Sequence, residues 1–160
     1  MNIEGYVYAI APRLENEDAW MPAHSLCDYS GVHCIKMDKF SVIETLNNLA
    51  DYLRTHKHVK VESTIVRGTF GLCVRPDIGF QEEYFKADFN ELKFLVDSMT
   101  LHDYSYESDR LKEIRNNVFP KCLNYAAIIG YRTVPFDTCI RWMQSGEMYY
   151  IYDVCGYGVL

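Results

Sequence analysis

The sequence lacks the features that would assign it quickly to a class. It has no Cys-x-x-Cys pair, no basic start followed by an apolar stretch, and no uninterrupted run of five or six acidic residues. Its longest apolar stretch, Tyr125 to Tyr131, is far too short to cross a bilayer. These absences argue against a secreted disulfide scaffold, a membrane protein and a protein that imitates the charge of DNA.

Recognisable catalytic motifs are also missing. No His-x-Thr or His-x-Ser pair recurs in two expected strands, as a two-histidine phosphoesterase would require, and Gly68-x-x-Gly71 lacks the lysine and the strand-loop-helix context of a phosphate cradle. His56 and His58 flank an expected helix end, where histidines are commonly solvated. We therefore lean towards a protein that is not an enzyme.

Acidic residues and thiols offer only weak catalytic candidates. The acids Glu82 and Glu83, and the group Glu15, Glu17 and Asp18, fall in expected loops, where carboxylates are usually solvated. His33 beside Cys34 is the only histidine adjacent to a cysteine in the sequence. A base must approach a thiol through space, so this adjacency alone does not indicate a nucleophile.

Composition indicates one ordinary globular domain. The chain has 160 residues, of which 49% are hydrophobic and 24% charged, and this is enough to bury a sizeable core in a single domain spanning 1–160. The net charge of −6 disfavours direct binding to nucleic acid. The 13 tyrosines are unusual and suit a wet binding face or a core whose hydroxyls reach its edge.

Six widely spaced cysteines suggest a reducing compartment. Because the sequence shows no secretory signal at its start, we expect a cytoplasmic protein with reduced, mostly buried thiols. They stand at Cys27, Cys34, Cys73, Cys122, Cys139 and Cys155.

Strands are predicted where apolar and β-branched residues alternate. The strongest pattern lies in 58–75, where the phase changes at Gly68, so a hairpin between 59–66 and 69–75 or one bulged strand is expected, at the centre of the sheet. Further strands are predicted at 3–11, 32–37 and 147–155, with an edge strand or loop at 79–87. The long connection 13–31 shows no periodicity, which is typical of functional or mobile loops.

Helices are predicted from apolar residues at a spacing of 3.6. Ser41 and Glu44 form a capping-box sequence before a helix whose inward face contains Val42, Leu46, Leu49, Ala50 and Leu53. Other helices are expected from Asp88, from Ser108 with Leu111, Ile114 and Val118 inward, over 121–129, and over 136–145. Since strands and helices do not alternate regularly, we predict an α+β domain, with a mainly antiparallel sheet and helices packed on one face.

A cluster of metal-ligand residue types lies near the long connection. His24, Cys27, His33 and Cys34 fall within eleven residues, and imidazole and thiolate are the ligands of tetrahedral zinc. However, neighbours such as His33 and Cys34 point to opposite faces of a strand. We predict no cofactor and no metal, with these four residues as the weak candidates for a metal site.

An aromatic and arginine group near the end of the sequence is the favoured binding surface. Tyrosine, tryptophan and arginine are enriched at the energetic centres of protein interfaces, although a tyrosine stripe on a sheet also fits ordinary cross-strand packing. The predicted partner-binding residues are Tyr131, Arg132, Arg141, Trp142, Tyr149, Tyr150 and Tyr152.

We therefore predict a non-enzymatic protein-binding domain. An acidic domain without a catalytic set fits an inhibitor or immunity-type protein that blocks a basic or nucleic-acid-handling target protein. Two alternatives remain open: a small cytosolic enzyme or metalloprotein that uses the cluster of His24, Cys27, His33 and Cys34, and a small-molecule sequestering protein whose 13–31 connection closes over a ligand.

Overall fold

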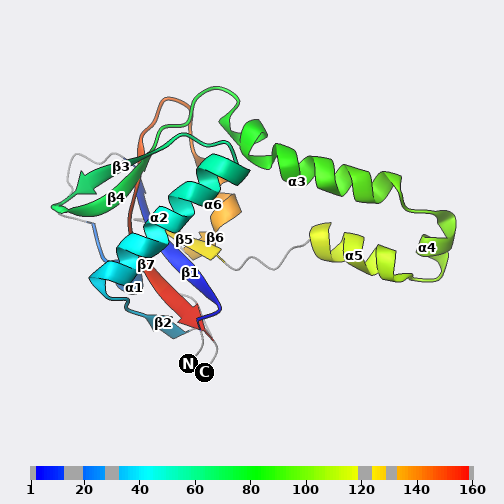
Figure 1. Cartoon of the computed structure of the whole chain (residues 1–160), viewed down its shortest axis with the longest axis horizontal. Coiled ribbons are helices and arrows are strands. Elements are labelled where there is room, and N and C mark those ends of the chain that lie inside the picture. The colour runs from blue at the N-terminus through cyan, green and yellow to red at the C-terminus, as the bar shows by residue number, and fades with distance from the viewer. Residues whose placement is uncertain (1–2, 13–19, 28–32, 119–123, 129–132, 159–160) are drawn as a thin grey trace.

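A seven-stranded sheet forms the body of the protein (Figure 1). The computed structural model describes residues 3–12, 20–27, 33–118, 124–128 and 133–158. Six strands follow the order β3-β4-β7-β1-β5-β6, and β2 also pairs with β7. Among the pairs formed by the described strands, only β1 and β5 run parallel, so the sheet is mainly antiparallel, as predicted.

The centre of the sheet is the pair β1 (Gly5–Pro12) and β7 (Tyr149–Gly158). They pair antiparallel along their whole length, with one irregularity in register between Ala9 and Ile10. Both strands were predicted from alternation. Because each also pairs with other strands on its outer edge, they are the most buried part of the sheet.

The hairpin predicted in 58–75 is confirmed as β3 (Val61–Val66) and β4 (Thr69–Val74). Arg67 and Gly68 form its turn with φ angles of 50° and 78°, which are the positive values that a two-residue hairpin turn requires. Its predicted position at the centre of the sheet is wrong, since β3 lies at one edge. A strong alternating pattern indicates a strand but does not show where that strand lies in the sheet.

The helix predicted over 121–129 is wrong, because residues 124–128 form strand β5 (Asn124–Ile128) beside β1. Ala126 and Ala127 are both fully buried, one in the cluster on each face of the sheet. A strand buried on both faces gives a continuous apolar run, which periodicity alone cannot distinguish from a buried helix. Strand β6 (Thr133–Pro135) continues the sheet beyond it.

The main helices of the body lie on one face of the sheet, which confirms the predicted α+β architecture. Helix α2 (Lys39–His56) buries the predicted stripe Leu46, Leu49, Ala50 and Leu53, and Val42 packs half-buried at its edge. Its cap differs from the prediction: Asp38, and not Ser41, is the N-cap and accepts a hydrogen bond from the Ser41 amide at 3.0 Å. Aspartate is as good an N-cap residue as serine, and Asp38 precedes Ser41 in the chain, so the helix begins earlier than predicted.

Two further helices flank the strands. Helix α6 (Phe136–Trp142) packs on the same face as α2 through Phe136, Cys139 and Ile140 and confirms a helix predicted there, although it ends three residues earlier. The short α1 (Ala23–Leu26) lies on the opposite face, where Ala23 joins the second core cluster. Strand β2 (His33–Ile35) lies within the strand predicted at 32–37.

Three helices extend away from the body (Figure 1). Residues 79–87 were predicted as a strand or loop, but helix α3 runs unbroken over Phe80–Asp97, because Phe80 and Tyr84, one turn apart, bury against the body. Helix α4 spans Leu101–Ser105. Helix α5 (Asp109–Val118) begins as predicted after Ser108, whose hydroxyl accepts from the Leu111 amide at 3.3 Å. The Val118 side chain lies outside the described part of the chain.

Candidate functional site

The helical arm, residues 80–118, is the first candidate surface. Phe80 and Tyr84 anchor its base in the body core. Farther out, α3 and α5 contact each other, and the buried side chains there are Leu95, Leu111 and Ile114. None of these three belongs to a core cluster of the body. The arm therefore has its own small interior and presents most of its surface to solvent.

Large apolar side chains gather on this arm. Thirteen such residues are exposed in the described parts of the chain, and six of them fall within residues 89–106. Leu101, Tyr104 and Tyr106, which we name the tip surface, are 65 to 80% exposed. Leu101 and Tyr104 are three residues apart on α4 and so share a side of that helix. Single exposed apolar residues are ordinary, whereas such a concentration marks a candidate interaction site.

The charge of the arm is acidic. Residues 80–118 contain nine aspartates and glutamates against five lysines and arginines, so this segment carries four of the six net negative charges of the chain. An apolar tip within an acidic arm complements a surface that is apolar at its centre and basic around it.

A notch in the sheet is the second candidate site. The outer edge of β7 pairs with β4 through residues 149–151 and with β2 through residues 156–158. Among the described strands, none pairs with residues 152–155 on that edge. Consequently the sheet is open between β4 and β2, and a cavity of about 430 Å³ lies at the opening.

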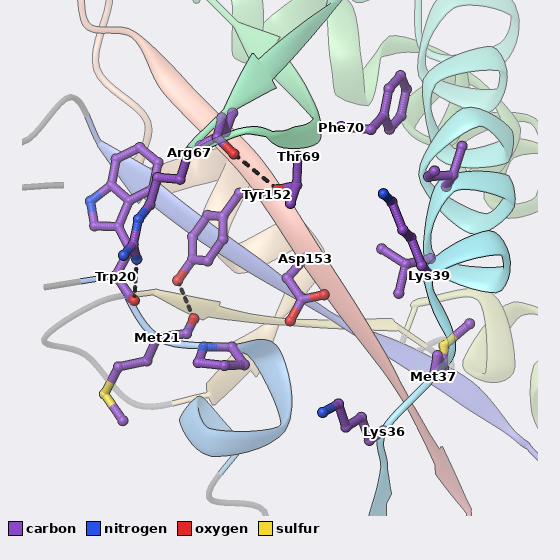
Figure 2. Close-up of a pocket in the computed structure, with 14 residues that line it drawn as sticks. Trp20, Met21, Lys36, Met37, Lys39, Arg67, Thr69, Phe70, Tyr152 and Asp153 are labelled. Carbon is purple, nitrogen blue, oxygen red and sulfur yellow. Dashed lines mark hydrogen bonds between the residues drawn. The ribbon is translucent and has the colours of Figure 1, made fainter. Parts of the chain in front are cut away.

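The cavity collects side chains from four separate segments (Figure 2). Trp20, Met21 and Pro22 form one wall, the residues around Arg67 a second, and Lys36 to Ile43 a third, with Tyr152 and Asp153 from β7 between them. Its volume falls in the range of small-molecule sites, which are mostly apolar with a few convergent polar groups.

Hydrogen bonds fix the walls of this cavity. Arg67 donates to the carbonyl of Trp20 at 2.8 Å, and the Tyr152 hydroxyl donates to the carbonyl of Met21 at 2.7 Å (Figure 2). The tryptophan ring also stacks on Tyr152, with centroids 5.1 Å apart. Asp153 accepts from the amide of Ala23 at 2.7 Å. The site is thus held in place without a ligand.

The cavity is rimmed by positive charge. Lys36, Lys39 and Arg67 line it, and in the described part of the structure no carboxylate lies within ion-pair distance of the three. Asp153 is the single acidic residue in the lining, and the amide of Ala23 already occupies one of its oxygens. The sequence indicated only parts of this site, the 13–31 connection and Tyr152, because the other lining residues come from segments far apart in the chain.

The predicted partner-binding residues are divided between the two faces of the sheet. Tyr150 and Tyr152 join Trp20 in a core cluster on one face, and the Tyr150 hydroxyl donates to the sulfur of Met148. On the other face, Trp142 and Tyr149 line a cavity of about 400 Å³, with Trp142 half exposed. The guanidinium of Arg141 lies 4.2 Å from the ring centroid of Phe85, on α3. Tyr131 and Arg132 lie outside the described residues.

Two of the described cysteines are bonded to each other. Cys27 and Cys34 form a disulfide, so the prediction that all six cysteines are reduced thiols is wrong for this pair. The sulfur of Cys155 lies within 4.8 Å of both. These sulfurs come from three separate segments, the end of α1, β2 and β7. Alternation and helix periodicity describe one segment at a time, so neither pattern could show that the sulfurs meet. Cys122 lies outside the described residues.

The other predicted candidates do not form a site. His24 and His33 are exposed, and no described histidine or carboxylate joins the group of Cys27, Cys34 and Cys155. Burial raises the pKa of the Cys155 thiol to about 12, with a further contribution from the charge of Asp153. A protonated thiol is a poor nucleophile, so this thiol does not resemble a catalytic cysteine.

The predicted acid and base residues are dispersed. His56 contacts the Thr55 hydroxyl at 2.9 Å and stacks on Tyr52, whereas His58 adopts a positive φ of 55° after the helix end. Glu82 and Glu83 lie exposed in the first turn of α3. Glu15, Glu17 and Asp18 fall outside the described residues.

Comparison with known proteins gives no relative for this chain: no family model, curated protein or solved structure matches it. In the described part of the chain, no helix combines the length and the apolar character that crossing a bilayer needs. The geometry of the chain itself must therefore carry any functional inference.

Proposed function

We propose that this protein is a non-enzymatic binding domain whose helical arm docks on a basic partner protein. The observation that carries the proposal is the tip surface of Leu101, Tyr104 and Tyr106, at the end of a projecting arm and 65 to 80% exposed. Leaving such side chains in water forfeits the free energy that burial would gain, about 25 cal/mol for each Å² of apolar surface. Tyrosines combine that apolar area with a hydroxyl that tolerates water, which suits a surface exposed before binding.

The base of the arm supports this role. Lys57 from the end of α2 donates to the carboxylate of Asp88 at 2.7 Å, and its amine lies 4.8 Å from the ring centroid of Tyr84. Such a fixed base presents the tip in one orientation, so less conformational freedom is lost when a partner binds.

The acidic charge favours one class of partner. The arm's excess of carboxylates would speed encounter with a basic surface and repel acidic ones, including nucleic acid itself. The finer role that we propose is inhibition: docking of the arm blocks the partner's own site, as an inhibitor or immunity-type protein does.

The test is the paired variant L101A/Y104A. Tagged wild-type protein is used to capture partners from lysates of its natural setting, and each captured protein is then purified and titrated directly. We expect a basic protein whose affinity falls by 1 kcal/mol or more for each anchor, that is, roughly fivefold or more. The control is Phe40→Ala, because Phe40 is 84% exposed on the body, away from the arm.

Three outcomes would contradict the proposal. Equal affinity of L101A/Y104A and wild type for every captured partner would show that the tip surface does not bind. An acidic partner would contradict the charge argument. Concentration-dependent dimers that L101A/Y104A abolishes would show that the tip binds a second copy of the chain instead. Inhibition is tested separately, by assaying the purified partner with and without the protein.

A second function, binding of a small organic anion, is favoured by the notch in the sheet. Lys36, Lys39 and Arg67 attract an anionic group, and the rings of Trp20, Phe70 and Tyr152 suit an aromatic or apolar body.

A panel of aromatic carboxylates and nucleoside monophosphates tests the notch by thermal denaturation. A true ligand raises the melting temperature further as its concentration rises, because the stabilisation increases with the logarithm of its concentration relative to Kd. The variant K36A/K39A should lose that shift, whereas Lys86→Ala, which removes an exposed lysine of α3, should keep it. If no member of the panel shifts the melting temperature of the wild type, this second function is wrong.

A further inference from the structure

Three cysteine sulfurs meet at one point of the fold although only two of them form a bond. The sulfurs of Cys27, Cys34 and Cys155 lie within 4.8 Å of one another. Cys27 and Cys34 are half-buried, and Cys155 is buried with 1% of its surface exposed. A disulfide uses two of the three sulfurs, so the position of Cys155 is not explained by the disulfide.

The surrounding backbone holds the three positions together. Cys34 lies on β2, which pairs with residues 156–158 of β7, directly after Cys155. Cys27 ends α1, and α1 is fixed to β7 by the hydrogen bond from the Ala23 amide to Asp153, at 2.7 Å. The same strand, β7, therefore positions the segments that carry all three sulfurs through contacts that do not depend on the disulfide.

Their spacing fits a metal with sulfur ligands. Zinc binds thiolates at about 2.3 Å, which places two sulfurs of a tetrahedral site roughly 3.8 Å apart. The three sulfurs lie within 4.8 Å of one another, so after reduction Cys27 and Cys34 must move apart and Cys155 must approach them, changes on the scale that rotation of a cysteine side chain produces. Other soft metal ions take the same donors, but zinc is the usual occupant of tetrahedral sulfur sites.

We propose that the reduced protein binds one zinc ion through Cys27, Cys34 and Cys155. A dithiol reductant first cleaves the sulfur–sulfur bond: two electrons and two protons pass to Cys27 and Cys34, and the reductant becomes a disulfide. Zinc then replaces the thiol protons of the three cysteines, which are released to solvent. The fourth ligand is not a cysteine of the described part of the chain, so the site keeps one position for solvent or another donor.

The cluster thus has two alternative states. In the oxidised state the Cys27–Cys34 bond prevents both sulfurs from binding metal as thiolates. In the reduced state zinc joins the end of α1 to β2, as the disulfide does, and also binds β7 through Cys155. This inference is independent of the binding role proposed for the arm, because the arm contains none of these residues.

The experiment uses cobalt(II) as a spectroscopic probe for zinc. Protein reduced by dithiothreitol and desalted without oxygen is titrated with Co²⁺, whose bonds to thiolates give a charge-transfer absorption band. We expect one equivalent to bind and zinc to displace it. Protein left oxidised should give no such band.

The informative variant is Cys155→Ala, with Cys139→Ala as its control. Both cysteines are 1% exposed, and burial raises the pKa of each to about 12. Cys139 lies in the other core cluster, apart from the three sulfurs. We expect Cys155→Ala to weaken metal binding by about a hundredfold or more, with Cys139→Ala unchanged.

The proposal is overturned if reduced wild-type protein gives no cobalt–thiolate band, or if Cys155→Ala binds as tightly as the control. Circular dichroism establishes that each variant is folded. If Cys155→Ala does not fold, Cys27→Ala replaces it, since Cys27 is only half-buried. Retention of one equivalent of zinc by Cys27→Ala in native mass spectrometry would equally contradict the proposal.

Discussion

The hydroxyl of Tyr84 donates a hydrogen bond to the carboxylate of Asp137 at 2.8 Å, and this contact joins the base of the arm to α6. Tyr84 is buried, so its hydroxyl has no access to bulk water as a substitute partner. Burial and the nearby charge of Asp137 both raise the pKa of this tyrosine well above its usual value. It therefore remains a donor at any physiological pH.

Removal of that hydroxyl should weaken the joint. Tyr84→Phe leaves the Asp137 carboxylate without its donor, and a hydrogen bond to a charged group contributes about 1.5–3 kcal/mol. We expect the free energy of unfolding in urea to fall by an amount near the lower end of that range. Tyr104→Phe is the control, because Tyr104 is exposed; equal stability of the two variants would show that the contact contributes little.

Gly71 should not tolerate a larger residue. A β-carbon there would lie 2.8 Å from a methyl carbon of Val66 and 3.2 Å from the carbonyl oxygen of Ile151. The carbonyl belongs to the sheet backbone and cannot move away, so we expect Gly71→Ala to destabilise the protein by about 1–3 kcal/mol.

A double-mutant cycle with Val66→Ala tests the cause of that loss. Removing the methyl groups of Val66 should cost less in the Gly71→Ala background than in the wild type, because part of the clash disappears with them. Simple additivity of the two free-energy changes would mean that the clash with Val66 is not responsible.

The thiols should differ in their rates of alkylation. Cys139 and Cys155 are buried, which raises the pKa of both to about 12, and Cys73 is only half-buried, with its pKa raised by burial and partly lowered by the charge of Arg75. We expect iodoacetamide to modify Cys73 before Cys139 and Cys155 at neutral pH, as read by peptide mass spectrometry. Fast modification of Cys139 or Cys155 in the native protein would contradict this burial.

Acid should loosen the tip of the arm. Asp103 accepts from the amide and hydroxyl of Thr100 and from the hydroxyl of Ser108, and these bonds lower its pKa from 3.8 to about 2. Since the folded-state pKa is the lower one, the stabilisation is complete above pH 3.8 and is lost as the pH falls towards about 2.

Amide hydrogen exchange across residues 100–108, followed over that pH range, measures the effect. Protection in wild-type protein should fall with the pH. In Asp103→Asn it should be lower at neutral pH and change less on acidification. An identical pH profile in both proteins would show that Asp103 does not control the capping of α4.

Local patterns predicted most individual elements correctly, but not the sites. The stripe of Leu46, Leu49 and Leu53 and the alternation in β1 and β7 depend on near neighbours in sequence, and these elements formed as predicted. The prediction of a helix over 121–129 was wrong because β5 is buried on both faces, which removes the alternation that identifies a strand.

The candidate sites depend on contacts between distant segments. Lys36, Arg67 and Asp153 meet in the cavity only because β2 and β4 separate along one edge of β7. Cys155 meets Cys27 because α1 packs against β7, again a contact between segments far apart in the chain. The exposed residues at the tip of the arm lie in the sequence LHDYSY, between two helices. Their apolar character could equally have indicated burial, so the sequence did not show that they are exposed.

Strand β7 determines when this fold can form during synthesis. It is the shared partner of β1, β2 and β4, and it lies after all of them in the chain. Until the ribosome has released residues 149–158, the other described strands can form only two separate groups, β3 with β4 and β1 with β5 and β6, and β2 has no strand partner. The nascent chain must therefore keep its central sheet incomplete until β7 is made, and the β3–β4 hairpin and the helices are the elements that contacts close in sequence can form earlier.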